Sequence, residues 1–203
     1  MKTENKNALL IVVSAPSGAG KSTLCNWVME CDPNITYSVS CTTRAPRGEE
    51  KNGAAYHFLS EAEFAQCLAN NEFLEHAQVH GYQYGTLKQT VYDALAEGRD
   101  IIMDIDVQGA AQIRAACAAL PDEDPIKKGF VDIFIAPPSM EELRRRLCGR
   151  STDAEDVIEQ RLRNAAEEMK QQSCYQHTVI NDELEKAGSE LIAIVLREHK
   201  NRA

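Results

Sequence analysis

The chain has 203 residues, a length that suits one domain with an insertion or two small lobes. Of these residues 43% are hydrophobic and 26% are charged, proportions typical of a globular protein. A formal net charge of −9 argues against a nucleic-acid-binding surface, because duplex binding requires clustered basic residues. The longest apolar runs have five or six residues, too few to span a membrane, and the polar N-terminus predicts no removable signal peptide.

The first predicted element is a buried strand over residues 9–13. It leads directly into Ser14-Ala-Pro-Ser-Gly-Ala-Gly-Lys-Ser-Thr23, and a helix is expected from about Ser22 to Glu30. A glycine-rich turn between a strand and a helix is the context of a phosphate-binding loop.

Each conspicuous residue type in this loop has a physical role. Gly18 and Gly20 lack a Cβ, so the backbone can take positive φ and direct N–H groups at phosphate oxygens. Lys21 is placed to reach the β- and γ-phosphates, and the Ser22 hydroxyl can hold Mg²⁺. Ala15 stands where the first glycine of the usual pattern is expected. The segment predicts binding of a nucleoside triphosphate.

The next part of the chain, from about 36 to 86, reads as a small mixed β insertion. Residues 37–40 alternate like a short strand, and residues 42–53 have the Arg, Pro, Gly and Glu content of a loop. Ser60 with Glu63 forms a capping box for a helix to about Asn70, and a hairpin over 73–84 turns at His80-Gly81. Thr86 with Gln89 forms a second capping box, for a helix ending before Gly98.

Short apolar strands then alternate with helices. Strands are expected over 101–105, 131–135 and 178–180, and helices over 108–119, from Ser139 to the interruption at 149–153, over 154–175 and over 184–197, with a polar surface loop over 121–129. This alternation predicts an α/β fold with a parallel sheet flanked by helices.

Two carboxylates follow the strand over 101–105. Asp104 ends it, where an acidic residue commonly completes the Mg²⁺ site of nucleotide-binding α/β folds, and Asp106 comes two positions later, beside Gln108-Gly109. Loop solvation explains many such carboxylates, but a pair at the carboxyl edge of the sheet favours a functional role.

Arginines occur in two groups. Arg44 and Arg47 flank Pro46 in a loop that is either a second anion site or simply solvated. Arg146 and Arg150 lie four apart on one helix, and Arg161 follows the interruption. Guanidinium groups on a moving lid can neutralise the charge of a transferring phosphoryl group. Position alone does not separate these from Arg144, Arg145 and Arg163, interpreted as surface charges.

The seven cysteines include no C-x-x-C pair, and the five histidines form no ligand spacing with them. Scattered reduced thiols in a cytoplasmic protein are the natural interpretation. Cys41 alone falls within a candidate site, where a packing role is favoured over reactivity.

Taken in order, these motifs resemble those of the guanylate kinases over nearly the whole chain, from Leu9 to Arg197. The stretches that carry the resemblance are Ser14 to Ser22, Ser38 to Arg47, Asn52-Gly53 with Tyr56, Asn71 to Glu75, Tyr84 to Thr86, Asp104 to Gly109, Ile135 to Ser139, and Val179 to Asp182. The phosphate loop is shared by many NTPases, whereas the stretch from Ser40 to Arg47 joined to that from Asp104 to Gly109 is specific to this family. Gln83, Ser151 and Glu183 depart from the common pattern.

The resemblance implies an ATP:GMP phosphotransferase that makes ADP and GDP, with dGMP as an expected further acceptor. The implied nucleotide-donor site comprises Ala15, Pro16, Ser17, Gly18, Ala19, Gly20, Lys21, Ser22, Thr23, Asn181 and Asp182, with Asn181-Asp182 by the adenine. The implied acceptor site comprises Ser40, Arg44, Arg47, Tyr56, Glu75, Tyr84, Thr86, Asp104, Asp106 and Gly109. Arg44, Arg47, Tyr56 and Tyr84 would hold the phosphate, and Ser40, Glu75 and Asp106 would meet the guanine. Lys21, Arg44, Arg146, Arg150 and Arg161 are the implied catalytic residues, and Ser22 and Asp104 the Mg²⁺ ligands.

The corresponding organisation is a P-loop NTPase-type core (1–35, 87–140 and 176–203), a GMP-binding insertion (36–86) and a helical lid (141–175). ATP, GMP and Mg²⁺ are the expected ligands, nucleic acid and membrane are not expected partners, and a homo-oligomer is left open. Two alternatives belong to other classes: a catalytically inactive scaffold domain that binds phosphorylated peptides, and a regulatory GTPase. The first normally lacks the phosphate-loop glycines and lysine, and the second requires an Asn/Thr-Lys-x-Asp element that this chain lacks.

Overall fold

The main sheet holds the chain's predicted strands in parallel. The computed structural model describes residues 7–79, 81–150 and 154–202, except the side chain of Arg150. Within these residues, five parallel strands lie in the order β2-β7-β1-β8-β9. They are β1 (Leu10–Ser14), β2 (Ile35–Tyr37), β7 (Asp100–Asp104), β8 (Phe130–Ala136) and β9 (His177–Ile180). The predicted parallel α/β sheet is confirmed.

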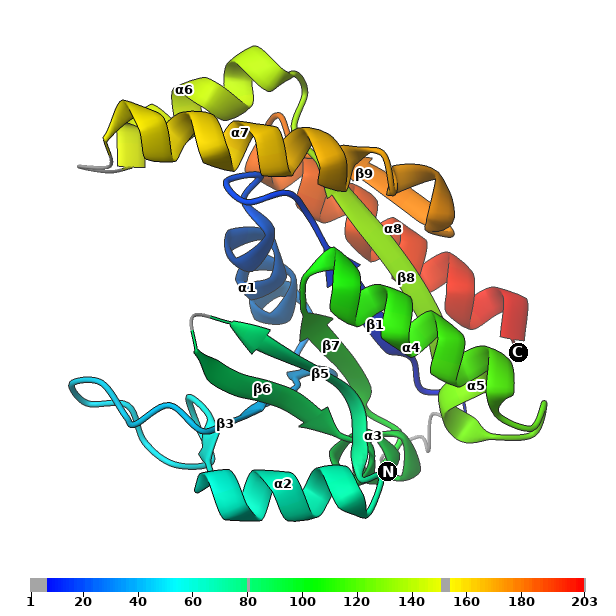
Figure 1. Ribbon diagram of the computed structural model, residues 1–203. Helices are drawn as coiled ribbons and strands as arrows, with labels where there is room; N and C mark the ends of the chain where they lie inside the picture. Colours follow the sequence, from blue (N-terminus) through cyan, green and yellow to red (C-terminus); the bar gives the residue numbers. More distant parts are fainter. Residues whose placement is uncertain (1–6, 80, 151–153, 203) are drawn as a thin grey trace.

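Helices cover both faces of this sheet (Figure 1). Helices α1 (Lys21–Cys31) and α8 (Leu184–Arg202) pack on one face, and α3 (Lys88–Ala96), α4 (Val107–Ala119) and α5 (Pro125–Gly129) pack on the other. Ile11 and Val13 of β1 belong to the first core, and Leu10 and Val12 to the second. Because a parallel strand in this position is buried on both faces, its sequence is a continuous apolar run instead of an alternating one.

A second sheet lies beside the first, in the order β4-β3-β6-β5. Its strands are β3 (Cys41–Thr42), β4 (His57–Phe58), β5 (Phe73–Val79) and β6 (Tyr82–Leu87), and α2 (Glu61–Ala69) packs against it. The rings of Phe64 and Phe73 stack with centroids 4.4 Å apart. A register shift between Phe73 and Glu75 brings Glu75 opposite Thr86 of β6.

Helices α6 (Met140–Arg150) and α7 (Glu155–Met169) form a pair that crosses the end of the main sheet near the loop after β1 (Figure 1). Leu143 and Leu147 of α6 pack with Ile158 and Ala165 of α7 in a separate small core. A 3₁₀ turn, η1 (Gln172–Cys174), connects α7 to β9. No helix among the described residues is both long and apolar enough to cross a membrane.

Local capping patterns were predicted with mixed success. The Ser60–Glu63 capping box is present and begins α2, and Ser139 accepts from the N–H of Glu142 at 3.1 Å as expected. The second capping box is wrong: α3 begins at Lys88 without a side-chain cap. Thr86 lies in β6 instead, because its hydroxyl donates to Glu75.

Several element boundaries also differ from the prediction; the final helix, for example, runs to Arg202 and not to Arg197. No single strand covers 37–40, since β2 ends at Tyr37 and β3 begins at Cys41. The helix expected over 154–175 ends at Met169. The expected surface loop over 121–129 contains α5, because Asp124 caps it and Ile126 is fully buried. Part of the interruption at 149–153, including Ser151, lies outside the described residues.

Candidate active site

The loop between β1 and α1 has the backbone that phosphate binding requires. Gly18 and Gly20 take φ values of +91° and +90°, in the region that favours glycine. A Cβ on Gly18 would lie 2.7 Å from Leu147 Cδ2, and one on Gly20 would lie 2.5 Å from Asn181 Nδ2. Ala15 is buried and is not among the described residues with positive φ, so this position does not need glycine here.

A cavity opens over this loop. Eight of the nine predicted loop residues line it, and two acidic residues from elsewhere complete it: Ala15, Pro16, Ser17, Gly18, Gly20, Lys21, Ser22 and Thr23, with Asp106 and Glu168. The ninth, Ala19, is fully buried, and its carbonyl accepts a 2.8 Å hydrogen bond from Asn181 Nδ2.

Asp104 connects this cavity to the strand edge. Its Oδ1 lies 2.6 Å from Lys21 Nζ, and its Oδ2 accepts a 2.5 Å hydrogen bond from Ser22 Oγ. Lys21 Nζ also donates to the carbonyl of Ile105 at 2.5 Å. Burial, together with the charge of Asp104, raises the pKa of the nearby Cys25 thiol to about 12, so this cysteine stays protonated. Lys21, Asp104 and Ser22 thus bring a cation, a carboxylate and a hydroxyl together where β1 and β7 end.

The donor set beside Lys21 suits Mg²⁺. Hydroxyl and carboxylate oxygens are the hard ligands this cation prefers, and Mg²⁺ in phosphotransfer sites takes one or two carboxylates plus phosphate oxygens and water. Ser22 and Asp104 offer this combination. The described residues contain no cluster of three or more His, Cys, Asp or Glu side chains that could hold a metal on their own.

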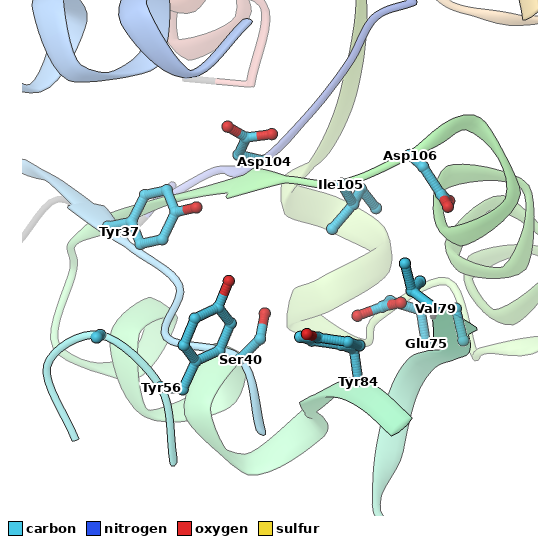
Figure 2. A pocket seen from close by; sticks show the side chains of 11 residues that line it. Tyr37, Ser40, Tyr56, Glu75, Val79, Tyr84, Asp104, Ile105 and Asp106 are labelled. Carbon is cyan, nitrogen blue, oxygen red and sulfur yellow. The ribbon is translucent and has the colours of Figure 1, made fainter. Parts of the chain in front are cut away.

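A second cavity lies between the two sheets (Figure 2). Six predicted acceptor residues line it together: Ser40, Tyr56, Glu75, Tyr84, Asp104 and Asp106. Tyr37, Ala55, Ala77, Val79 and Ile105 complete the lining. Figure 2 shows the hydroxyl of Tyr37 directed into this space. Because Asp106 lines both cavities and Asp104 links them through Lys21 and Ser22, the two spaces meet at the end of β7.

Glu75 is the buried carboxylate of this second cavity, with 6% of its surface exposed. Thr86 Oγ1 donates to its Oε1 at 2.8 Å, and Ser40 Oγ lies 3.5 Å from Thr86 Oγ1. Desolvation, and to a lesser degree the charge of Asp106, raises the pKa of Glu75 above its ordinary value. A Cβ on Gly109 would lie 3.1 Å from Glu75 Oε2, so glycine leaves room for the carboxylate.

Asp106 also begins α4. Its Oδ1 accepts a 2.8 Å hydrogen bond from the N–H of Gly109, as the N-cap of the helix. Gly109 and Thr86 are not among the residues that line the cavity; both lie against Glu75, which does line it.

Arg44 and Arg47 share one acidic partner, Glu50, which sequence reasoning missed. The Arg44 guanidinium donates to Glu50 Oε1 at 2.9 Å and lies 5.3 Å from the ring centroid of Tyr56. The backbone N–H of Arg47 donates to Glu50 Oε2 at 2.8 Å. The hydrogen bond that Arg44 donates to Glu50 raises the pKa of Arg44, which keeps the guanidinium charged beside Tyr56. Arg47 is exposed, and neither arginine is among the residues lining the cavity.

The arginines of α6 and α7 make contacts in two different places. Arg146 donates to the carbonyls of Asn181 and Asp182 at 2.9 and 3.3 Å and to Glu142 at 2.8 Å. Arg161 Nη2 donates to Ser17 Oγ of the phosphate loop at 2.9 Å. The backbone of Arg150 belongs to α6, but its side chain is outside the described part of the chain.

The three arginines interpreted as surface charges pair with neighbouring polar side chains. Arg145 bonds Glu142, and Arg163 bonds Gln160. Arg144 contacts Glu155 and Glu159, so it also joins α6 to α7, which the sequence did not indicate.

A third hollow adjoins the phosphate loop on the side of β9. Gly20, Thr23, Arg146, Asn181, Asp182 and Leu184 line it. The predicted Asn181-Asp182 pair therefore lies next to the loop, with an exposed apolar side chain, Leu184, that sequence reasoning missed.

Glu168, Glu50 and Tyr37 are polar residues of the site without a sequence-based prediction. A glutamate on an exposed helix and one in a polar loop carry no local signal that separates them from solvated neighbours. Tyr37 could have been identified from its position just before the predicted acceptor serine, at the end of a strand.

Comparison with known proteins matches this chain to one family throughout. The family model described as guanylate kinase matches residues 7–198. A guanylate kinase of Dechloromonas aromatica is 47% identical over 186 residues, 92% of this chain and 87% of that protein. One of Koribacter versatilis is 46% identical over 96% of this chain and 80% of its own length.

Solved structures agree. A crystal structure of guanylate kinase from Anaplasma phagocytophilum superposes with a TM-score of 0.71 at 33% identity, covering 96% of this chain and 87% of that one. A gluconokinase from Sinorhizobium meliloti, at 15% identity and a TM-score of 0.52 over 96% of this chain and 95% of its own, shares the fold alone.

Proposed function

Because this chain belongs to the guanylate kinase family and transfers the γ-phosphoryl group of ATP to GMP, we propose how its residues divide that work. One observation carries the assignment. The phosphate-loop cavity and the cavity between the sheets meet at Asp104 and Asp106. Donor and acceptor phosphates bound in these two cavities would therefore face each other across the end of β7, as in-line transfer requires.

The phosphate loop is the proposed ATP site. Its amides and Lys21 would hold the β- and γ-phosphates, and Ser22 with Asp104 would hold Mg²⁺, which supplies charge neutralisation at the phosphates. Arg161, already in contact with Ser17, would neutralise the phosphoryl group as its bond to ADP breaks and a bond to GMP forms. Arg150 is proposed to assist. The hollow beside Asn181 and Asp182 is proposed for adenine.

The cavity between the sheets is the proposed GMP site. Guanine presents two donors, N1–H and the 2-amino group, which one carboxylate can accept together. Glu75 is proposed to accept both, with Ser40 and Asp106 as further base contacts. Arg44, Arg47, Tyr56 and Tyr84 are proposed to hold the acceptor phosphate. In this arrangement Glu50 keeps Arg44 in place until the phosphate arrives.

The proposed domain division assigns 1–35, 87–140 and 176–203 to the core, 36–86 to the GMP-binding insertion and 141–175 to the lid. The second sheet and the α6–α7 pair support it. A cytoplasmic location, the use of dGMP and the absence of a nucleic-acid partner remain predictions.

The decisive experiment is a coupled assay for ADP formation with GMP, dGMP, AMP, UMP and dTMP as acceptors. Turnover with GMP and dGMP alone is expected. Turnover with AMP equal to that with GMP would refute the assignment of Glu75, Ser40 and Asp106 to the base.

A further inference from the structure

An acidic side chain lies in the cavity proposed for phosphates. Glu168, in the last turn of α7, lines the hollow over the phosphate loop opposite Lys21 and Ser22. A carboxylate at this position repels the phosphates of an entering nucleotide. The presence of a negatively charged side chain in a site proposed for phosphates therefore needs a physical reason.

The residue shares its target with Arg161. The two lie seven positions apart on α7, which places them on the same face of the helix two turns apart. Arg161 donates to the hydroxyl of Ser17, and the backbone of the same residue lies near enough to the Glu168 carboxylate to favour its charged form. Helix α7 thus places both side chains at Ser17.

The carboxylate is incompletely satisfied. Within the described part of the chain, Glu168 Oε2 is buried without a hydrogen-bond partner. Three groups surround it: Asp106 from the end of β7 repels it, while Lys21 and the backbone of Ser17 stabilise its charge. Desolvation, together with the charge of Asp106, outweighs the stabilising contacts and raises the pKa of Glu168. Because an unpartnered buried carboxylate oxygen costs free energy, a ligand that takes the place of Glu168 would relieve that cost.

We propose that Glu168 sets the affinity of the phosphate loop for its nucleotide, by occupying the Ser17 end of the loop in the free protein and yielding that place to a phosphate oxygen. This inference rests on the proposed donor site. It assigns to Glu168 the role of an affinity-determining residue, because its carboxylate and the nucleotide phosphates compete for the same part of the cavity.

The test is a calorimetric titration, in the absence of Mg²⁺, of ADP into wild type and into the Glu168→Gln variant. The variant is expected to bind ADP about tenfold more tightly, because the amide removes the like charge at nearly constant shape. Glu167→Gln is the matched control: its side chain is 71% exposed and pairs with Lys170, so a change below twofold is expected.

The outcomes distinguish failure of the role of Glu168 from failure of the donor site. Glu168→Gln affinity equal to or weaker than wild type would overturn the role of Glu168, as would equal gains in both glutamine variants. If Glu168→Gln melts below the assay temperature, Glu168→Asp replaces it in the test. This variant withdraws the carboxylate by one methylene and is expected to bind ADP more tightly than wild type. Failure to bind ADP more tightly would overturn the proposal. Wild type that does not bind ADP would instead refute the donor site itself.

Discussion

Replacement of Glu75 by Gln tests the proposed base recognition with little change in shape. Thr86 Oγ1 already donates to Oε1 at 2.8 Å, so the glutamine is expected to keep its oxygen there. Its NH₂ group then takes the place of Oε2 and faces the donors of guanine. One charge-assisted hydrogen bond is lost and a donor faces a donor, which costs about 3 kcal/mol, or roughly 100-fold in kcat/KM for GMP.

AMP should respond in the opposite direction. Adenine carries an acceptor at N1, which the new NH₂ group can meet, so the GMP-over-AMP ratio of kcat/KM is expected to fall by at least the loss for GMP. The assay is coupled ADP formation with each acceptor. Glu72→Gln, a change at an exposed residue whose carboxylate accepts from Asn70, serves as the control. An unchanged ratio in Glu75→Gln would refute the reasoning.

The same substitution should alter stability in a pH-dependent way. Burial raises the pKa of Glu75 above 4.5 in the folded protein, so between the unfolded and folded pKa values the native state binds more protons. Wild type therefore loses stability as pH rises through this window, and Glu75→Gln does not. The glutamine variant is expected to gain in Tm relative to wild type between pH 4 and pH 8, as measured by thermal melts; a falling difference would contradict the raised pKa.

Three further predictions concern the phosphate loop and the arginines. Lys21→Ala should keep the wild-type Tm but lose about 3 kcal/mol or more of transition-state stabilisation, and near-normal turnover would exclude the role of this lysine. Arg44→Met should mainly raise KM for GMP and Arg161→Met mainly lower kcat, and steady-state kinetics with the reverse pattern would exchange the two roles. Gly18→Ala should destabilise the protein by about 1–3 kcal/mol because of its positive φ and its contact with the α6 core, as urea denaturation would show. Gly149→Ala in α6, where no described atom lies within 4 Å of the added Cβ, should be neutral or stabilising by up to about 1 kcal/mol, and equal losses in both glycine variants would contradict the steric argument.

Features set by local sequence were predictable. The φ values of Gly18 and Gly20 follow from the strand–loop–helix context, and the Ser60–Glu63 box forms within four residues. Thr86 shows where such reasoning fails. Its local pattern matches a helix cap, but a buried carboxylate eleven residues earlier in the chain takes the hydroxyl.

Contacts between distant segments needed the structure. The position of Glu75 depends on a register shift between β5 and β6, and that of Glu168 on how α7 lies over the phosphate loop. In sequence, Glu167 and Glu168 are adjacent acidic residues of one helix, and only packing separates the solvated one from the one in the site. The family resemblance identified most residues of the cavity between the sheets, but not Glu50, the one acidic partner that Arg44 and Arg47 share.

The hydrogen bond from Asn181 to the Ala19 carbonyl spans 162 positions of the chain. The phosphate loop therefore leaves the ribosome well before Asn181, which follows strand β9. Until β9 has joined the sheet, the loop lacks the side chain that supports Ala19, and Arg146 lacks the carbonyls it binds. We therefore expect a nascent chain to acquire nucleotide affinity only after β9 is made, so that ATP and ADP would stabilise the finished fold and not its precursors.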